Sequence, residues 1–258
     1  MNDPTIEAWL KDLPVEGGVY ILAPPSTFEA NYGRVRTLER RILTDAQVRQ
    51  LPNVEGLWNA EEWRIRERGA LRLKNALDKV GEVLRVLEVG CGNGWLSARL
   101  HQAGHDVLGI DAFTDELMQA ARVFDGPSFA RADVLSSPLP SGLFDVVVFA
   151  ASFQYFEDAA LTLSRCFDLL KPEGEVHVLD TILYRSSAEA RAATQRSKDY
   201  YDGLGCPEMA AHYHAHQLST IQALGKVRIL STPNGMERTL KRFGRPSSPF
   251  THVVIHRQ

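Results

Sequence analysis

The sequence predicts an α/β protein with a doubly wound, mostly parallel sheet and helices on both faces. Short apolar, β-branched runs alternate with segments of helical periodicity, three closely spaced glycines follow one of these runs, and several runs end in an acidic residue. Seven strands are expected, over residues 86–89, 105–111, 128–131, 144–150, 175–180, 226–230 and 251–256. The last two have no clear helix between them, so we expect an antiparallel strand at one edge of the sheet.

The composition is that of an ordinary globular protein, with 44% hydrophobic and 24% charged residues among 258. No apolar run approaches the roughly 20 residues that span a bilayer, and the first residues lack the basic start and apolar centre of a secretory signal. Three widely spaced cysteines favour a reducing compartment, so we expect a cytoplasmic protein without a membrane segment. The net charge of −3 argues against nucleic acid as a partner.

Residues 1–58 are expected to form an N-terminal extension that acts as a lid or contacts substrate, and residues 59–258 the main domain. Within the extension, residues 19–22 predict a short strand, whereas residues 28–50 mix strand and helix signals. A helix is expected from about 59 to 80, with Asn59 as its cap, because its apolar residues recur at helical spacing. Trp63 on this helix could pack on the sheet or contact a ligand.

The glycine-rich stretch connects the strand at 86–89 to a helix at 95–103. Gly90, Gly92 and Gly94 allow positive backbone torsions and close approach of a ligand, and the following helix adds unpaired N–H groups. A turn that merely joins strand to helix is the alternative. The spacing differs from the G-x-G-x-x-G of dinucleotide sites, and the lysine and hydroxyl of a phosphate-binding loop are absent.

Acidic residues follow the next two strands. Asp111 ends the strand at 105–111, before a helix at 114–123 that Thr114 can cap, and Asp133 lies just beyond the strand at 128–131. The strand at 144–150 is apolar throughout, as expected for a central parallel strand. Ligands of such sheets bind beyond the carboxyl ends of the strands, so these acids and the glycines are predicted to line one cleft.

The C-terminal half begins with a helix at about 157–170, followed by the strand at 175–180. A polar segment of about residues 184–216, rich in tyrosine and histidine, then interrupts the alternation as an insert, and a helix is expected from 217 to 224.

With these motifs in place, the chain resembles the class I S-adenosylmethionine-dependent methyltransferases, of the small-molecule, methyltransferase 11-like type. The resemblance covers about residues 83–183. It rests on E-V-G-C-G-x-G from Glu88 to Gly94, G-I-D-A from Gly109 to Ala112, the F-D signature from Phe144 to Asp158, and an L-K-P-x-G sequence that ends at Gly174. The fold implied is Rossmann-like, with S-adenosyl-L-methionine as cofactor.

The resemblance implies roles for individual residues. The turn of Glu88, Gly90, Cys91, Gly92 and Gly94 would hold the amino acid part of the cofactor. Asp111, with Ala112 beside it, would take the ribose hydroxyls, Asp133 and Val134 would meet the adenine, and Ala150 would complete the site. Cys91 is expected to pack rather than to react, because no basic neighbour in the sequence lowers its pKa.

A general base is harder to assign. His212, His214 and Tyr155 are the candidate catalytic residues, because histidine and tyrosine offer useful proton chemistry. The candidate substrate contacts are Gln154, Tyr200, Tyr201, Tyr32 and Trp63. His212, His214 and His216 could instead be solvated, or could suggest a metal, but only the outer pair would meet on a helix and no carboxylate or cysteine cluster completes a site, so no metal is predicted.

The leading hypothesis is therefore methyl transfer from S-adenosyl-L-methionine to an oxygen or nitrogen of a small molecule by a monomer or homodimer. One alternative is an inactive cofactor-binding partner subunit, since no strong base follows Ala150. Another is methylation of RNA or protein, favoured only by the arginine groups at 34–41 and 64–72. Acidic residues lie among the arginines at 34–41, which favours a solvated face there.

Overall fold

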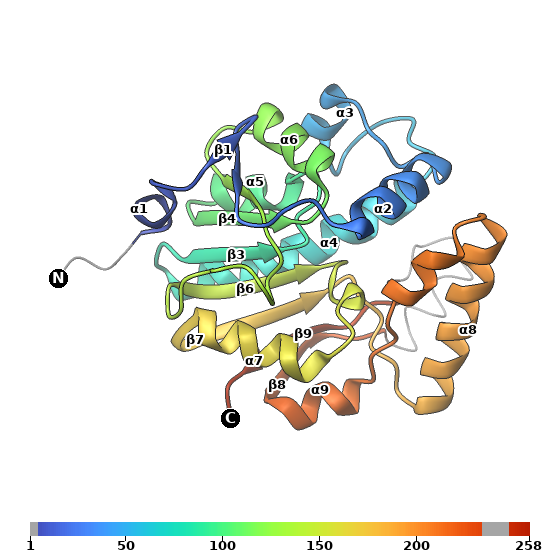
Figure 1. Cartoon of the computed structure of the whole chain (residues 1–258). Coiled ribbons are helices and arrows are strands. Elements are labelled where there is room, and N and C mark those ends of the chain that lie inside the picture. The colour runs from blue at the N-terminus through green and yellow to red at the C-terminus, as the bar shows by residue number, and fades with distance from the viewer. Residues whose placement is uncertain (1–4, 234–247) are drawn as a thin grey trace.

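The computed structural model describes residues 5–233 and 248–258, which share one mixed sheet covered by helices (Figure 1). The strands are β1 (Val15–Glu16), β2 (Val19–Ile21), β3 (Arg85–Val89), β4 (Asp106–Asp111), β5 (Ser128–Arg131), β6 (Phe144–Ala150), β7 (Leu170–Leu179), β8 (Lys226–Ser231) and β9 (His252–His256). The α-helices are α1 (Ile6–Leu10), α2 (Thr27–Leu38), α3 (Asp45–Gln50), α4 (Ala60–Leu77), α5 (Trp95–Gln102), α6 (Thr114–Val123), α7 (Ala159–Leu169), α8 (Ser187–Gly203) and α9 (Leu218–Leu224). Short 3-10 helices are η1 (Asp78–Val80), η2 (Phe153–Tyr155) and η3 (Pro207–His212).

The strand order is β1-β2-β5-β4-β3-β6-β7-β9-β8, so β3 and β6 lie at the centre of the sheet. The seven strands predicted for the main domain are confirmed as β3 to β9, and the predicted antiparallel pairing holds, because β9 runs antiparallel to both β7 and β8. The short strand predicted at residues 19–22 is confirmed as β2, which pairs in parallel with β5. β1 is an addition, and it pairs antiparallel with β2.

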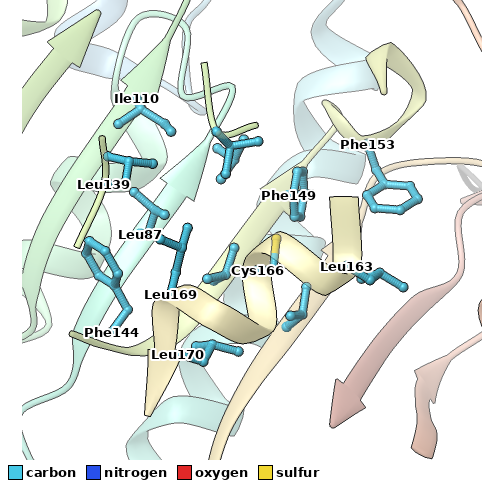
Figure 2. Packing of buried hydrophobic residues seen from close by; sticks show 14 of the residues in the cluster. Leu87, Ile110, Leu139, Phe144, Phe149, Phe153, Leu163, Cys166, Leu169 and Leu170 are labelled. Carbon is cyan, nitrogen blue, oxygen red and sulfur yellow. The ribbon is translucent and has the colours of Figure 1, made fainter. Parts of the chain in front are cut away.

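The central strands bury both of their faces, as their continuous apolar sequences predict. Val86 of β3 and Val148 of β6 pack with α4 and α5, whereas the next residue along each strand, Leu87 and Phe149, packs with α7 on the opposite face. Figure 2 shows this second face, where Leu163, Cys166 and Leu169 of α7 lie over Leu87 and Phe149. Helices on both faces leave the carboxyl ends of the parallel strands as the open edge of the sheet.

Of the two predicted helix caps, one has the predicted position and one is wrong. Asn59 is the N-cap residue of α4, as predicted, although its side chain makes no capping hydrogen bond. Thr114 is the first residue of α6, whose N-cap is Phe113, and the Thr114 N–H donates to the Glu29 carboxylate of α2 at 2.8 Å. A contact with a helix 85 residues away in the sequence thus takes the place of a local cap.

The insert at 184–216 is largely helical in the structure. It contains α8 and η3, and it is closed at its base by a parallel bridge between Tyr184 and Gln217. Of the interval between β8 and β9, residues 234–247 lie outside the described part, so the expectation that no helix joins these strands is not tested there. Among the residues described, no helix has the length and apolar character needed to cross a membrane.

We expect Gly94→Ala to destabilise the protein more than Gly104→Ala. Both glycines have positive φ, 73° and 98°, so alanine costs roughly 1–2 kcal/mol at either position. A Cβ at residue 94 would also lie 2.6 Å from the ring of Phe129, which adds roughly 1–3 kcal/mol of overpacking, whereas at residue 104 it would meet nothing within 4 Å. Urea unfolding measures the difference, and equal losses for the two variants would contradict this account of the turn.

Candidate active site

A cavity of ≈ 840 Å³ opens at the carboxyl ends of β3, β4, β6 and β7. Its floor is formed by the strand ends and the glycine turn, and its cover comes from α2, α4, α8 and η3. In Figure 1, α2 and α8 lie beyond the arrowheads of the central strands. This volume falls within the range of small-molecule sites, roughly 300–1,000 Å³.

The glycine turn has a backbone conformation that only glycine adopts at low cost. Gly90, Gly92 and Gly94 have φ values of 75°, 53° and 73°. A Cβ at Gly90 would lie 2.4 Å from the Cβ of Ser152, and the Ser152 hydroxyl donates to the Val89 carbonyl. The turn is therefore packed directly against the end of β6, which fixes its height above the sheet.

Asp111 fastens the turn to the end of β4. Its carboxylate accepts hydrogen bonds from the N–H of Gly92 at 2.8 Å and from the N–H of Phe113 at 2.9 Å, one on each oxygen. Burial raises the pKa of Asp111 to about 6, although the two backbone donors oppose this effect. Because each carboxylate oxygen can accept more than one hydrogen bond, Asp111 retains acceptor capacity toward the cavity that it lines.

Glu88 lies beneath the turn and is 2% exposed. Burial raises the pKa of its carboxyl to about 8, while a hydrogen bond donated by the Ser97 hydroxyl acts in the opposite direction. Cys91 is also buried, and burial raises the pKa of its thiol well above the usual value. A protonated thiol in this position is a packing group, as the sequence predicts.

The remaining predicted cofactor contacts also lie on the cavity wall. Ala112 follows Asp111, Asp133 and Val134 follow β5, and Ala150 ends β6. Asp133 is exposed and accepts hydrogen bonds from the N–H of Leu135 and the hydroxyl of Ser136. These residues therefore share one edge of the sheet with the glycine turn and Asp111.

Gly94 differs from the other predicted cofactor residues. It does not line the cavity, and its role is to allow close packing of the turn on Phe129.

Aromatic side chains from three separate segments form a roof over the cavity, consisting of Phe28, Tyr32, Tyr155, His212 and Tyr213. The centroid of the Phe28 ring lies 5.3 Å from that of Tyr32, 5.8 Å from that of Tyr155 and 5.1 Å from that of His212. Tyr155 also contacts Tyr213 at 6.2 Å. α2, η2 and the insert therefore meet in this roof.

Polar contacts hold α2 over α6. Arg36 donates to Glu116 at 2.6 Å, and both side chains are largely buried. Glu29 accepts the N–H of Thr114, and the ring of Tyr32 packs on Phe113 at 5.4 Å. The ion pair could not be predicted from the sequence, because its partners are separated by 80 residues and lack a local signature.

A second, charged side of the cavity lies between α4 and β7. Glu62 accepts hydrogen bonds from both Arg41 and Arg66, and the Arg66 guanidinium lies over the ring of Trp63 at 4.9 Å. Trp63 in turn packs against Trp95 at 5.6 Å. Trp63 thus combines the two roles considered for it, since it packs in the core and lines the cavity.

Asp180 follows β7 and lines the same side of the cavity. It is 7% exposed, and within residues 5–233 and 248–258 no hydrogen bond or ion pair reaches its carboxylate. Burial raises its pKa to about 6, while Arg66 and Arg72 oppose this effect. Asp180 is a cavity residue that was not predicted, although it ends a predicted strand in the same way as Asp111.

The predicted catalytic and substrate residues are distributed unevenly. Those that line the cavity are Tyr155, His212, Gln154, Tyr200, Tyr201, Tyr32 and Trp63. His214 does not line the cavity. Its backbone N–H donates to the Gln154 carbonyl at 2.8 Å, and burial lowers the pKa of its ring. Among the residues described, no group of three or more histidine, cysteine, aspartate or glutamate side chains is arranged to hold a metal ion.

Two of the predicted substrate residues are already engaged by the protein. The Gln154 amide donates to the Ala151 carbonyl and accepts from the Thr181 hydroxyl, so it braces the loop after β6. The Tyr200 hydroxyl donates to Glu39, which connects α8 to the end of α2.

Tyr155, a predicted catalytic residue, cannot readily supply a phenolate. Burial raises the pKa of Tyr155 to about 12, so its hydroxyl stays protonated at neutral pH.

Comparisons with known proteins agree with this geometry. Residues 87–178 match the family model described as a methyltransferase domain. A malonyl-[acyl-carrier protein] O-methyltransferase of Erwinia billingiae is 29% identical over 111 residues, which are 43% of this chain and 44% of that protein. A 27-O-demethylrifamycin SV methyltransferase of Amycolatopsis mediterranei is 29% identical over 174 residues, 62% of each chain.

A solved structure extends the comparison of the fold. Phosphoethanolamine N-methyltransferase 2 of Haemonchus contortus, in complex with S-adenosyl-L-methionine, superposes with a TM-score of 0.57 at 16% identity, over 90% of this chain and 60% of that one. The chain spans less than two thirds of the length of these relatives. Residues 87–178 thus match a methyltransferase domain, and the sheet has the mostly parallel, Rossmann-like arrangement that the motifs predict.

We expect Glu88→Gln to remove a pH dependence of stability. The folded-state pKa of about 8 lies above the ordinary value of 4.5, so burial of neutral Glu88 is fully stabilising below pH 4.5 and this stabilisation is lost as the pH rises through 8. The loss is on the order of 1.4 kcal/mol for each pH unit across this window. Urea unfolding of both proteins between about pH 5 and pH 9, which covers most of this window, tests the effect. Parallel stability profiles would contradict it.

Proposed function

We propose that the protein transfers a methyl group from S-adenosyl-L-methionine to an oxygen or nitrogen of a small-molecule acceptor. The observation that carries this proposal is one cavity shared by the glycine turn, the strand-end acids and a charged, aromatic cover. The methyltransferase domain match at residues 87–178 supports the cofactor class, and the enclosed space beneath the cover supports a small acceptor.

The residues of the floor suit such a cofactor. The open acceptor capacity of Asp111 fits ribose hydroxyls, and the positive-φ glycines leave backbone groups accessible where an amino acid moiety would bind. Asp133 and Val134 combine a polar acceptor with an apolar surface, as an adenine ring requires. When bound, the cofactor supplies an electrophilic methyl group, and the chain supplies alignment of the acceptor, which can contribute roughly 7–11 kcal/mol in well-oriented cases.

The cover favours a small acceptor over RNA. Arg36 and Arg41, which the sequence places in a basic group, are engaged by Glu116, Glu39 and Glu62 and so do not form a free cationic surface. The aromatic roof also encloses the cavity from above. An inactive cofactor-binding subunit remains the second hypothesis, and turnover separates it from an enzyme.

The cytoplasmic location and the monomeric or homodimeric state are also proposals. Cys91, Cys166 and Cys206 are buried and unpaired, which is consistent with a reducing compartment. Sedimentation of the purified protein would determine the number of subunits.

We expect Asp111→Ala to weaken binding of S-adenosylhomocysteine roughly ten- to hundred-fold, because a charge-assisted hydrogen bond contributes roughly 1.5–3 kcal/mol. Asp106→Ala is the matched control, since Asp106 begins the same strand at the edge away from the cavity. Isothermal titration calorimetry measures both affinities. Equal affinities for the two variants, or no binding to the wild type, would contradict the proposed cofactor site.

We expect the wild type to transfer label from methyl-labelled S-adenosyl-L-methionine to members of a panel of small alcohols, phenols, amines and carboxylates. Asp111→Ala should reduce the rate at limiting cofactor concentration in parallel with its affinity. Mass spectrometry of the products identifies the methylated atom. Cofactor binding without turnover on any member would support the inactive-subunit hypothesis instead.

A further inference from the structure

The proposed reaction needs a group that takes up the proton of a hydroxyl or ammonium acceptor. Tyr155 is unsuited to this role, because its hydroxyl is protonated at neutral pH. His214 lies outside the cavity lining, and His212 packs edge-on to Phe28 within the roof. On the charged side of the cavity, the carboxylate of Asp180, which follows β7, remains as a proton acceptor without a hydrogen-bond partner among the described residues.

The backbone places Asp180 next to the loop that follows β6, and this loop in turn contacts the glycine turn. The Ala151 N–H donates to the Leu179 carbonyl at 3.0 Å, so the residues that follow β6 and β7 leave the sheet side by side. Ser152, the next residue along, contacts Gly90. Asp180 itself has a φ of 54°, which is uncommon for a residue other than glycine and directs the chain sharply at this point.

The helix above Asp180 makes room for its carboxylate. Gly69 lies in the middle of α4, and a Cβ there would be 2.8 Å from one Asp180 carboxylate oxygen and 3.2 Å from the other. Glycine costs roughly 1 kcal/mol relative to alanine inside a helix, so its presence here is explained by the carboxylate rather than by helix stability. Arg66 and Arg72 lie near enough to favour the anion, while burial favours the acid.

We propose that Asp180 accepts the proton of the methyl acceptor, and that the protein therefore methylates hydroxyl or amine groups rather than carboxylates. This inference deepens the proposed function and rests on it. An unpaired, buried carboxylate attracts an O–H or N–H donor and repels a second carboxylate, which carries no proton to remove at neutral pH.

The proton and electrons balance within the named groups. The O–H bond of a hydroxyl acceptor, or an N–H bond of an ammonium acceptor, breaks and its proton moves to the Asp180 carboxylate. The electron pair left on oxygen or nitrogen forms the new bond to the methyl carbon, and the pair of the broken carbon–sulfur bond stays on the sulfur of the sulfonium. Asp180 then releases its proton to solvent.

The test compares Asp180→Asn, Asp180→Glu and Gly69→Ala with Asp106→Asn, a control outside the cavity. Substrates are the skeleton-matched compounds benzyl alcohol, benzylamine and benzoate, with larger matched sets from the panel. We expect Asp180→Asn to lower kcat by roughly 10²–10⁴ while S-adenosylhomocysteine affinity is unchanged, and Asp180→Glu to restore part of the rate. Gly69→Ala should lower kcat without loss of folding stability, and Asp106→Asn should behave as the wild type.

A second measurement, which does not depend on turnover, detects the protonation state of the Asp180 carboxyl directly. The infrared spectrum of the wild type minus that of Asp180→Asn should contain a carboxylic acid band that disappears as the pH rises through about 6. Asp111 has a similar pKa, but its band is present in both proteins and cancels in this difference. A wild-type rate in Asp180→Asn, or methylation of the carboxylates in preference to the alcohols and amines, would overturn this inference and leave the proposed function intact. Failure of the wild type to bind S-adenosylhomocysteine or to methylate any compound would overturn both.

Discussion

The site depends on one carboxylate that joins the ends of two neighbouring strands. Asp111 accepts the N–H groups of Gly92 and Phe113, so the turn after β3 and the chain after β4 are held in one arrangement before any ligand arrives. Ser152 adds a second tie, from the end of β6 to Val89. A ligand that binds this turn meets donors and acceptors that are already ordered, which lowers the entropy cost of binding.

The side of the cavity that contains the glycine turn could be predicted because its signals are local. The three glycines, Asp111 and Asp133 each lie within a few residues of a strand end, and the sheet alone then brings them together. β1 could not be predicted in the same way, because it contains two residues and pairs with β2 at the edge of the sheet.

The cover of the cavity could not be assembled from sequence for a related reason. Its members come from α2, α4, the end of β7 and the insert, and each is placed by contacts across long stretches of chain, such as Arg36 with Glu116. The failed cap at Thr114 has the same origin, because Glu29 of α2 supplies its hydrogen-bond acceptor. Asp180 is the exception, since a strand that ends in an acid is apparent in the sequence and the reasoning applied to Asp111 selects it.

The hydrogen bond between Tyr200 and Glu39 joins α8 to the end of α2, two parts of the cavity cover, although the two residues are 161 positions apart in the sequence. α2 and α8 both lie outside the sheet. Either helix can therefore change in length or composition while the strand ends and the glycine turn keep their geometry. The acceptor side of the cavity can therefore change through these two segments, provided that α2 keeps its contacts with α6 and that the residues at positions 39 and 200 change together.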